Sequence, residues 1–108
     1  MRKIYTDCLV EYTASMIANK WKILILRDLI TGIKRYNELT RSVKGISAKV
    51  LTENLRELEK DGIIIRKVYP VVLPKVHYSL TEKGNDLKLI IDLMRNFGNK
   101  YKGSITKS

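Results

Sequence analysis

Apolar side chains recur at intervals of three and four residues in five stretches of the chain, the spacing of an amphipathic helix. Residues 20–31 show this spacing clearly and are followed by Gly32, a helix-stopping residue. Their apolar side is formed by Trp21, Leu24, Ile25 and Leu29. Ser47 is placed to cap a later helix that ends at Asp61 and Gly62. The pattern predicts helices at residues 10–19, 20–31, 36–43, 48–60 and 81–103.

Two stretches rich in β-branched residues, 63–69 and 75–80, flank the sequence PVVLP. Pro70 and Pro74 lack the amide proton that a strand ladder needs, so they belong at the tip of a hairpin. Polar and apolar side chains alternate in the second stretch, which gives one buried and one exposed face. The buried face would carry Val76, Tyr78 and Leu80, and the exposed face Lys75, His77 and Ser79.

This order of elements predicts a single domain, residues 1–108, that is mainly α with a small β-hairpin wing. Its helix-turn-helix unit would span residues 36–60, and the second helix of such a unit enters the major groove of DNA. The wing would span residues 63–80, and further helices lie at both ends. The expected fold is therefore a winged helix-turn-helix (α+β) with added N- and C-terminal helices.

The charge of the chain narrows the choice of partner. It carries 21 Lys and Arg against 11 Asp and Glu, for a formal net charge of +10. Such an excess favours a polyanion, because neutralising phosphates releases condensed counterions. An anionic membrane surface would attract the same charge. The basic residues are spread along the sequence, so a basic surface has to be assembled by folding.

Several functional classes find no support in the sequence. No apolar run approaches the ~20 residues of a membrane span, and the N-terminal MRKIYTDC lacks the apolar segment of a signal peptide. Cys8 and His77 alone cannot form an internal disulfide or a Cys/His metal site, and a lone cysteine fits a reducing cytoplasm. Nucleotide-binding and catalytic motifs do not occur. We expect a cytoplasmic protein that is no enzyme and holds no metal or cofactor, with Trp21 and Tyr36 in the core rather than stacking on a ligand.

The predicted helix 48–60 has two distinct faces. Its apolar stripe consists of Leu51, Leu55 and Leu58. The opposite face carries Lys49, Thr52, Glu53 and Arg56. Lys49 and Arg56 can donate hydrogen bonds to guanine edges or phosphates, and Thr52 is short enough to approach a base closely. The alternative is a solvated face with a Lys49–Glu53 ion pair, since polar outer faces are common on helices.

The hairpin that follows this helix would add phosphate or minor-groove contacts. For Arg66 an ion pair with Asp61 is an equally good interpretation. The candidate DNA-binding residues are Arg35, Ser47, Lys49, Val50, Thr52, Glu53, Arg56, Arg66, Lys67, Lys75 and His77. A protein-interaction module that binds an acidic partner is the rival function. RNA binding is a third, although the sequence lacks the stacking aromatics of an RRM-type sheet.

Several motifs in a fixed order resemble those of the HxlR family of bacterial transcription regulators, relatives of the MarR group. They are Cys-x-Val-Glu, Lys-Trp-Lys, Arg-Tyr-Asn-Glu-Leu, Gly-Ile-Ser-x-Lys-x-Leu-Thr and Val-x-Tyr-Ser-Leu-Thr-x-x-Gly. The resemblance covers about residues 8–101 and implies a homodimeric winged-helix protein that binds double-stranded operator DNA. It departs from the family at Leu9, where proline is frequent.

A homodimer is also expected from the last helix. Its apolar stripe extends past the wing, where a chain of this length has little core left to cover it. The alternative is that this helix folds back on its own domain. The expected interface residues are Tyr12, Met16, Leu87, Ile90, Met94, Phe97 and Tyr101.

Cys8 is the candidate redox sensor, because the family resemblance implies a reactive cysteine near the N-terminus of some members. Arg2, Lys3 and the amide donors of the first helix would favour its thiolate, and Asp7 would oppose it. As a single thiol it could form a disulfide only between molecules. The effector would then be a small electrophile or oxidant. The alternative is that Cys8 is a small packing residue.

Overall fold

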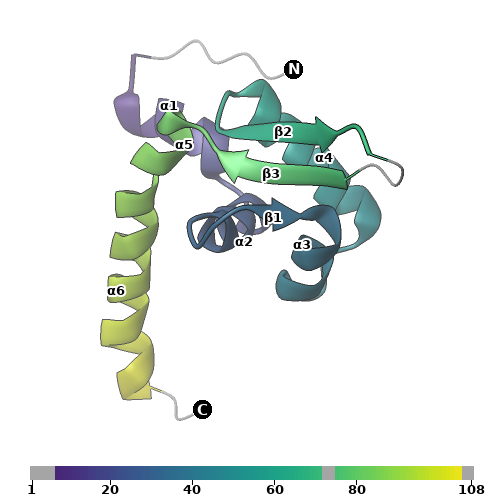
Figure 1. Cartoon of the computed structure of the whole chain (residues 1–108). Coiled ribbons are helices and arrows are strands. Elements are labelled where there is room, and N and C mark those ends of the chain that lie inside the picture. Colours follow the sequence, from purple (N-terminus) through teal and green to yellow (C-terminus); the bar gives the residue numbers. More distant parts are fainter. Residues whose placement is uncertain (1–6, 72–74, 106–108) are drawn as a thin grey trace.

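The computed structural model describes residues 7–71 and 75–105, over which the chain forms six helices and a three-stranded sheet (Figure 1). In chain order the elements are α1 (Leu9–Ile17), α2 (Lys20–Leu29), β1 (Lys34–Arg35), α3 (Tyr36–Ser42), α4 (Ala48–Lys60), β2 (Ile64–Tyr69), β3 (Lys75–Leu80), α5 (Glu82–Asp86) and α6 (Lys88–Ile105). This mainly helical chain with a small antiparallel sheet confirms the predicted fold class. Pro74 in the expected hairpin tip, and Arg2 and Lys3, lie outside the described residues.

The sheet has the strand order β1-β3-β2, and both pairings are antiparallel. The hairpin of β2 and β3 matches the expected wing, but β1 was not predicted, because two residues are too short to show an alternating pattern. Strand β3 is consequently central. His77 on β3 pairs with Arg35 on one side and with Lys67 on the other.

The core lies between the helices and one face of the sheet. Helix α2 contacts α3, α4, α6 and β3, so it forms the centre of the domain. The side chains of Leu39, Leu51, Leu58 and Ile63 are almost fully buried in this core. Each such side chain stabilises the fold by about 1.5–3 kcal/mol relative to an exposed position. The leucine stripe predicted for α4 therefore anchors that helix to the domain.

The expected C-terminal helix 81–103 is divided into α5 and α6 at Leu87. The N–H of Leu87 donates to the carbonyl oxygen of Gly84 at 3.0 Å, a tighter bond than the helical i to i−4 pattern, and the Leu87 side chain is buried. Gly84 itself packs against the chain at Ile63, where a Cβ would lie 2.2 Å from the carbonyl oxygen. Beyond this junction α6 extends away from the body of the domain (Figure 1).

Candidate nucleic-acid interface

Helix α4 begins where the sequence predicted. The backbone turns at Gly45, whose φ of 87° suits glycine, and the side chain of Ser47 then accepts a hydrogen bond from the N–H of Val50 at 3.1 Å. Lys49, Glu53 and Arg56 are exposed along the outer face of the helix. Over the described residues, Lys49 and Glu53 form no ion pair with each other, so their charged groups face solvent separately.

The first half of α4 is held in place by Tyr36, the first residue of α3. Its hydroxyl donates to the carbonyl oxygen of Ala48 at 3.1 Å and lies 3.0 Å from Oγ1 of Thr52. Tyr36 is half-buried and packs against the core as expected, but these hydrogen bonds could not be predicted from the pattern of residues. Thr52 consequently has a structural partner in addition to its outward position on α4.

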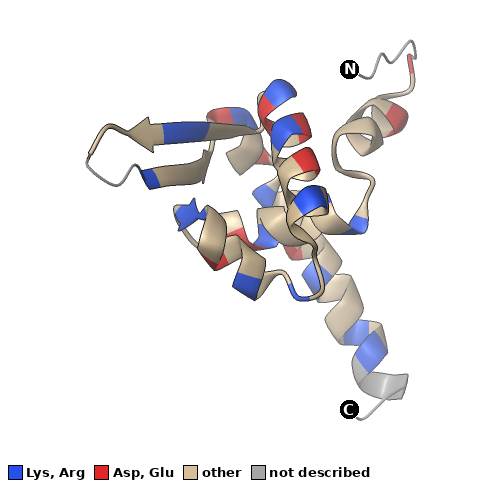
Figure 2. Cartoon of the chain, turned by 90° about the vertical axis from the view of Figure 1, so that its right-hand side faces the viewer, with Lys and Arg blue, Asp and Glu red and all other residues tan. Residues whose placement is uncertain are grey.

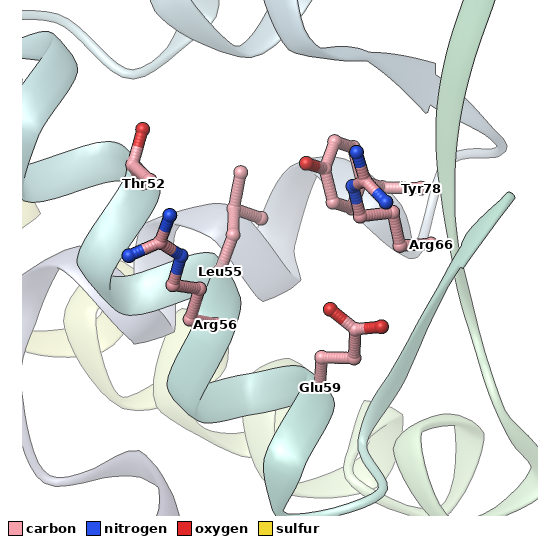
Figure 3. A pocket seen from close by; sticks show the side chains of 6 residues that line it. All are labelled: Thr52, Leu55, Arg56, Glu59, Arg66 and Tyr78. Atoms are coloured by element: carbon pink, nitrogen blue, oxygen red, sulfur yellow. The ribbon is translucent and has the colours of Figure 1, made fainter. Parts of the chain in front are cut away.

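A cleft of about 420 Å³ separates the second half of α4 from the wing (Figure 3). It is lined by Thr52, Leu55, Arg56, Glu59, Arg66 and Tyr78. Arg66 pairs in register with the buried Tyr78, so it lies on the face of the wing that looks toward α4. In the described part of the chain neither Arg56 nor Arg66 takes part in an ion pair, and the alternative Arg66–Asp61 pair is not formed. The cleft therefore offers two guanidinium groups to an anion, and the carboxylate of Glu59 lies in the same cleft.

The opposite face of the wing carries Lys67, Tyr69, Lys75 and His77. Lys67 and Lys75 are exposed, and the Lys67 ammonium lies 5.4 Å from the Tyr69 ring centroid. The expectation of an exposed His77 was wrong: it is half-buried, because β3 is the central strand, and its ring packs edge-on against Tyr69 at 4.8 Å. Its Nε2 atom is buried without a hydrogen-bond partner among the described residues.

Arg35 and Lys75 line a second surface hollow, of about 240 Å³, together with Tyr36, Asn37 and Val76. The N–H of Arg35 donates to Oε1 of Glu38 at 2.8 Å, and this backbone hydrogen bond holds the pKa of Glu38 below its ordinary value. The Arg35 guanidinium remains exposed beside the wing. Figure 2 shows Lys and Arg segments on α3, α4 and the wing, with Asp and Glu segments between them on α4.

The helix-turn-helix is tied to α2 through Asp28. Arg27 and Ser42 both donate hydrogen bonds to its carboxylate, Arg27 at 2.8 Å and Ser42 at 2.5 Å. Burial alone would raise the pKa of Asp28, but these hydrogen bonds outweigh it and hold the pKa below its ordinary value. Asp28 therefore stabilises the end of α3 in its ionised form.

The terminal helices expose an apolar surface. Leu9 and Val10 of α1 and Met94 of α6 line a groove of about 550 Å³ that also reaches α2 at Ile23. Phe97 is 68% exposed, and its ring packs against Tyr101 with centroids 5.0 Å apart. Exposed positions on both helices thus form one continuous apolar region.

Two residues expected on the dimer surface are instead part of the domain's own core. Met16 and Leu87 are each 8% exposed, because α1 packs its inner side onto the domain and the α5–α6 junction turns Leu87 inward. They have almost no surface left for a partner, so we leave them out of the proposed interface. Tyr12, Met94, Phe97 and Tyr101 are exposed, and Ile90 is half-buried.

Cys8 is exposed and occupies the N-cap position of α1, where its side chain makes no capping hydrogen bond. Within residues 7–71 and 75–105 no group of three or more His, Cys, Asp and Glu side chains could hold a metal ion. Over the same residues, the helices are all too short or too polar to cross a membrane.

Comparison with known proteins gives consistent matches. The model of the HxlR-like helix-turn-helix family matches residues 16–106. YdeP of Bacillus subtilis (strain 168), an uncharacterized HTH-type transcriptional regulator, is 48% identical over 95% of this chain and 80% of that protein. YtcD of the same organism, also an uncharacterized HTH-type transcriptional regulator, is 46% identical over 91% of this chain and 78% of that protein. The solved structure of the redox regulator HypR in its oxidized form has a TM-score of 0.83 and 46% identity, covering 86% of this chain and 96% of that chain.

Proposed function

The chain belongs to the HxlR-like helix-turn-helix family, and from that membership we propose that it binds operator DNA as a homodimer, with α4 in the major groove. Its relatives are HTH-type transcriptional regulators, which are not enzymes, and the chain is a transcriptional regulator with a helix-turn-helix domain. Because it would act on chromosomal DNA, we place it in the cytoplasm.

The observation that carries this proposal is the exposed outer face of α4 beside the arginine-lined cleft. Lys49 and Arg56 would reach base edges or phosphates in the major groove, with Ser47, Val50 and Glu53 close to the same DNA. Arg66 would bind a phosphate from the opposite wall of the cleft. Lys67, Lys75 and Arg35 would add affinity that does not depend on sequence.

The second subunit is proposed to cover the apolar surface of α1 and α6. A contiguous exposed apolar patch on a domain of this size is typical of an interaction surface. Proteins with a two-fold axis bind two half-sites about one DNA turn apart, roughly 10 base pairs from centre to centre. Two copies of this chain would therefore present two α4 helices to a two-fold operator.

Cys8 is proposed to make DNA binding responsive to oxidants. Its support is its exposure at the start of α1 and the similarity to HypR, a redox regulator. Two Cys8 thiols from different subunits would lose two protons and two electrons to an oxidant such as diamide and form one disulfide. Because α1 belongs to the proposed subunit interface, this bond would change the separation of the two α4 helices.

Selection of a duplex from a random-sequence pool by the purified protein tests the proposed function. We expect a two-fold symmetric consensus with half-sites about 10 base pairs apart, and an affinity for it that falls with salt. If the selected pool stays random while the protein binds an acidic polypeptide, the chain is a protein-interaction module instead.

A further inference from the structure

Two buried polar side chains join α2 to α4. Asn54, only 6% exposed, accepts a hydrogen bond at Oδ1 from Nδ2 of Asn19 at 3.0 Å. Its own Nδ2 donates to the carbonyl oxygen of Val50 at 2.8 Å, so both ends of this amide are satisfied. Lys22, only 3% exposed, donates from Nζ to Oε1 of Glu57 at 2.5 Å. Both links connect residues that are 35 positions apart in the chain.

These links lie at one edge of the outer face of α4. At about 100° per residue, Asn54 and Glu57 fall between the leucine stripe and the face that carries Glu53 and Arg56. The other edge is bounded by the wing cleft and by the hydrogen bond between Tyr36 and Thr52. The outer face of α4 is therefore supported from both edges by polar groups.

Stability alone does not explain why Asn54 and Lys22 are buried here. Burying an ammonium group has a desolvation cost that an ion pair often fails to offset, and an apolar residue of similar volume is frequently as stable. The van der Waals contacts of Leu51, Leu55 and Leu58 anchor α4 to the core, but each of them depends less sharply on angle than a hydrogen bond does. Hydrogen bonds depend on distance and angle, so the two links define one rotation and one axial position of α4.

We infer that Asn54 and Lys22 are positioning residues that fix the orientation of α4 for discrimination between DNA sequences. This inference rests on the proposed function. Neither side chain reaches DNA, since Asn54 is buried where α4 meets the start of α2 and Lys22 is buried where α2 meets α4. They act through the angle at which Arg56 and its neighbours meet the base edges, and a displacement of about 1 Å is enough to lose a direct contact.

Asn19 connects these links to the N-terminal part of the chain. Its Oδ1 atom accepts from the N–H of Lys22 at 3.0 Å and so caps α2, while its Nδ2 atom holds Asn54. It follows α1 after a single intervening residue, Ala18. A change in the position of α1 would consequently reach α4 through one side chain.

The test compares variants that replace each link by an apolar residue of similar size, Asn54→Leu and Lys22→Met. Asn85→Leu and Lys88→Met make the same chemical changes at exposed positions of α5 and α6 and serve as matched controls. Asn19→Ser is a third variant, because serine still caps α2 but is too short to reach Asn54. The probes are the duplex that the wild type selects from a random pool and a shuffled duplex of the same composition.

We expect Asn54→Leu and Lys22→Met to lose about tenfold in affinity for the selected duplex, the size of one lost base contact. Their affinity for the shuffled duplex should match that of the controls. Their melting temperature should be equal to or higher than that of the controls. Asn19→Ser should also lose affinity for the selected duplex. The double variant Asn19→Ser/Asn54→Leu should lose no more affinity than Asn54→Leu alone, because both changes remove the same hydrogen bond between Asn19 and Asn54.

Three results would overturn the inference. Parallel losses on both duplexes together with a lower melting temperature would make the two residues ordinary structural groups. An unchanged ratio of the two affinities would show that orientation does not depend on these links. A wild-type protein that selects no duplex at all would rule out the proposed function, and the inference with it. The second result, obtained with a wild type that discriminates normally, would rule out the inference and leave the proposed function intact.

Discussion

The hydroxyl of Tyr36 lies 3.0 Å from Oγ1 of Thr52, which joins the first residue of α3 to the middle of α4. The same hydroxyl donates to the carbonyl oxygen of Ala48, one turn earlier on α4. A single side chain thus holds together the two helices of the helix-turn-helix. Because Thr52 is one of the expected base-reading residues, this contact bears on both stability and DNA binding.

Tyr36→Phe should lower the free energy of unfolding by about 1 kcal/mol, because it removes these hydrogen bonds and keeps the aromatic ring. It should also weaken binding to the selected duplex, since the first half of α4 loses its support. Urea denaturation and DNA titration measure the two effects. Tyr12→Phe, at an exposed position on α1, is the control for the denaturation experiment alone, because Tyr12 belongs to the proposed subunit interface. Equal stability of Tyr36→Phe and wild type would show that the hydroxyl contributes nothing.

Asp28 should make the fold sensitive to acid. Its pKa is lower in the folded state, so its contribution is complete above the unfolded-state value of about 4 and is lost as the pH falls through the folded value. Asp28→Asn should be less stable than wild type at pH 7, by about 1 kcal/mol, and the difference should shrink below pH 4. Denaturation curves from pH 7 to pH 3 measure this dependence.

The matched control for Asp28 is Asp92→Asn. Asp92 pairs with Arg95 on the exposed surface of α6 at 3.0 Å, and surface pairs of this kind contribute little. It should have nearly wild-type stability across the same pH range. If the two variants show the same pH dependence, the hydrogen bonds of Asp28 are not the source of acid sensitivity.

Phe97→Glu should convert the proposed homodimer into a monomer. It places a carboxylate in the middle of the apolar surface of α6, where a partner subunit would have to desolvate it. Asn85→Glu adds the same charge on exposed α5 and should remain dimeric. Sedimentation at micromolar concentration distinguishes the two states. A monomeric wild type would contradict the proposed assembly.

Cys8→Ser should bind DNA like the wild type but should no longer respond to diamide. The expected response of the wild type is a change in affinity together with a covalent dimer on a non-reducing gel, because the disulfide can form only between chains. Reduction with a dithiol should reverse both changes. If diamide leaves wild-type binding unaltered, Cys8 is a packing residue and a signal has to enter elsewhere.

The helices and the outer face of α4 could be predicted from the sequence because both follow from local periodicity. Ser47 and the leucine stripe of α4 belong to patterns that extend over only a few residues. The division of the C-terminal helix could not be predicted. It arises because Gly84 packs closely against Ile63 and turns Leu87 into the core. That contact exists only after the hairpin has returned the chain to the end of α4.

The polar links between α2 and α4 were beyond the reach of sequence patterns for the same reason. Lys22 stands in the segment KWKILIL, where a lysine is expected to face solvent. Asn54 falls on the margin of the leucine stripe, a position that polar and apolar residues both occupy. Their burial depends on the packing of α2 against α4, and the residues that this packing joins are 35 positions apart in the chain. His77 was misjudged because the strand β1 that flanks it was not predicted.

We propose that the outer face of α4 reads DNA sequence while the wing supplies affinity alone. Binding of Arg56→Ala to the selected and shuffled duplexes, measured over a series of salt concentrations, separates these two roles. We predict a loss of about 1–3 kcal/mol on the selected duplex and a much smaller loss on the shuffled one. Lys67→Ala, the comparison, should weaken both alike and reduce the salt dependence by about one unit. Equal losses on the two duplexes for Arg56→Ala would show that the outer face of α4 does not read sequence through Arg56.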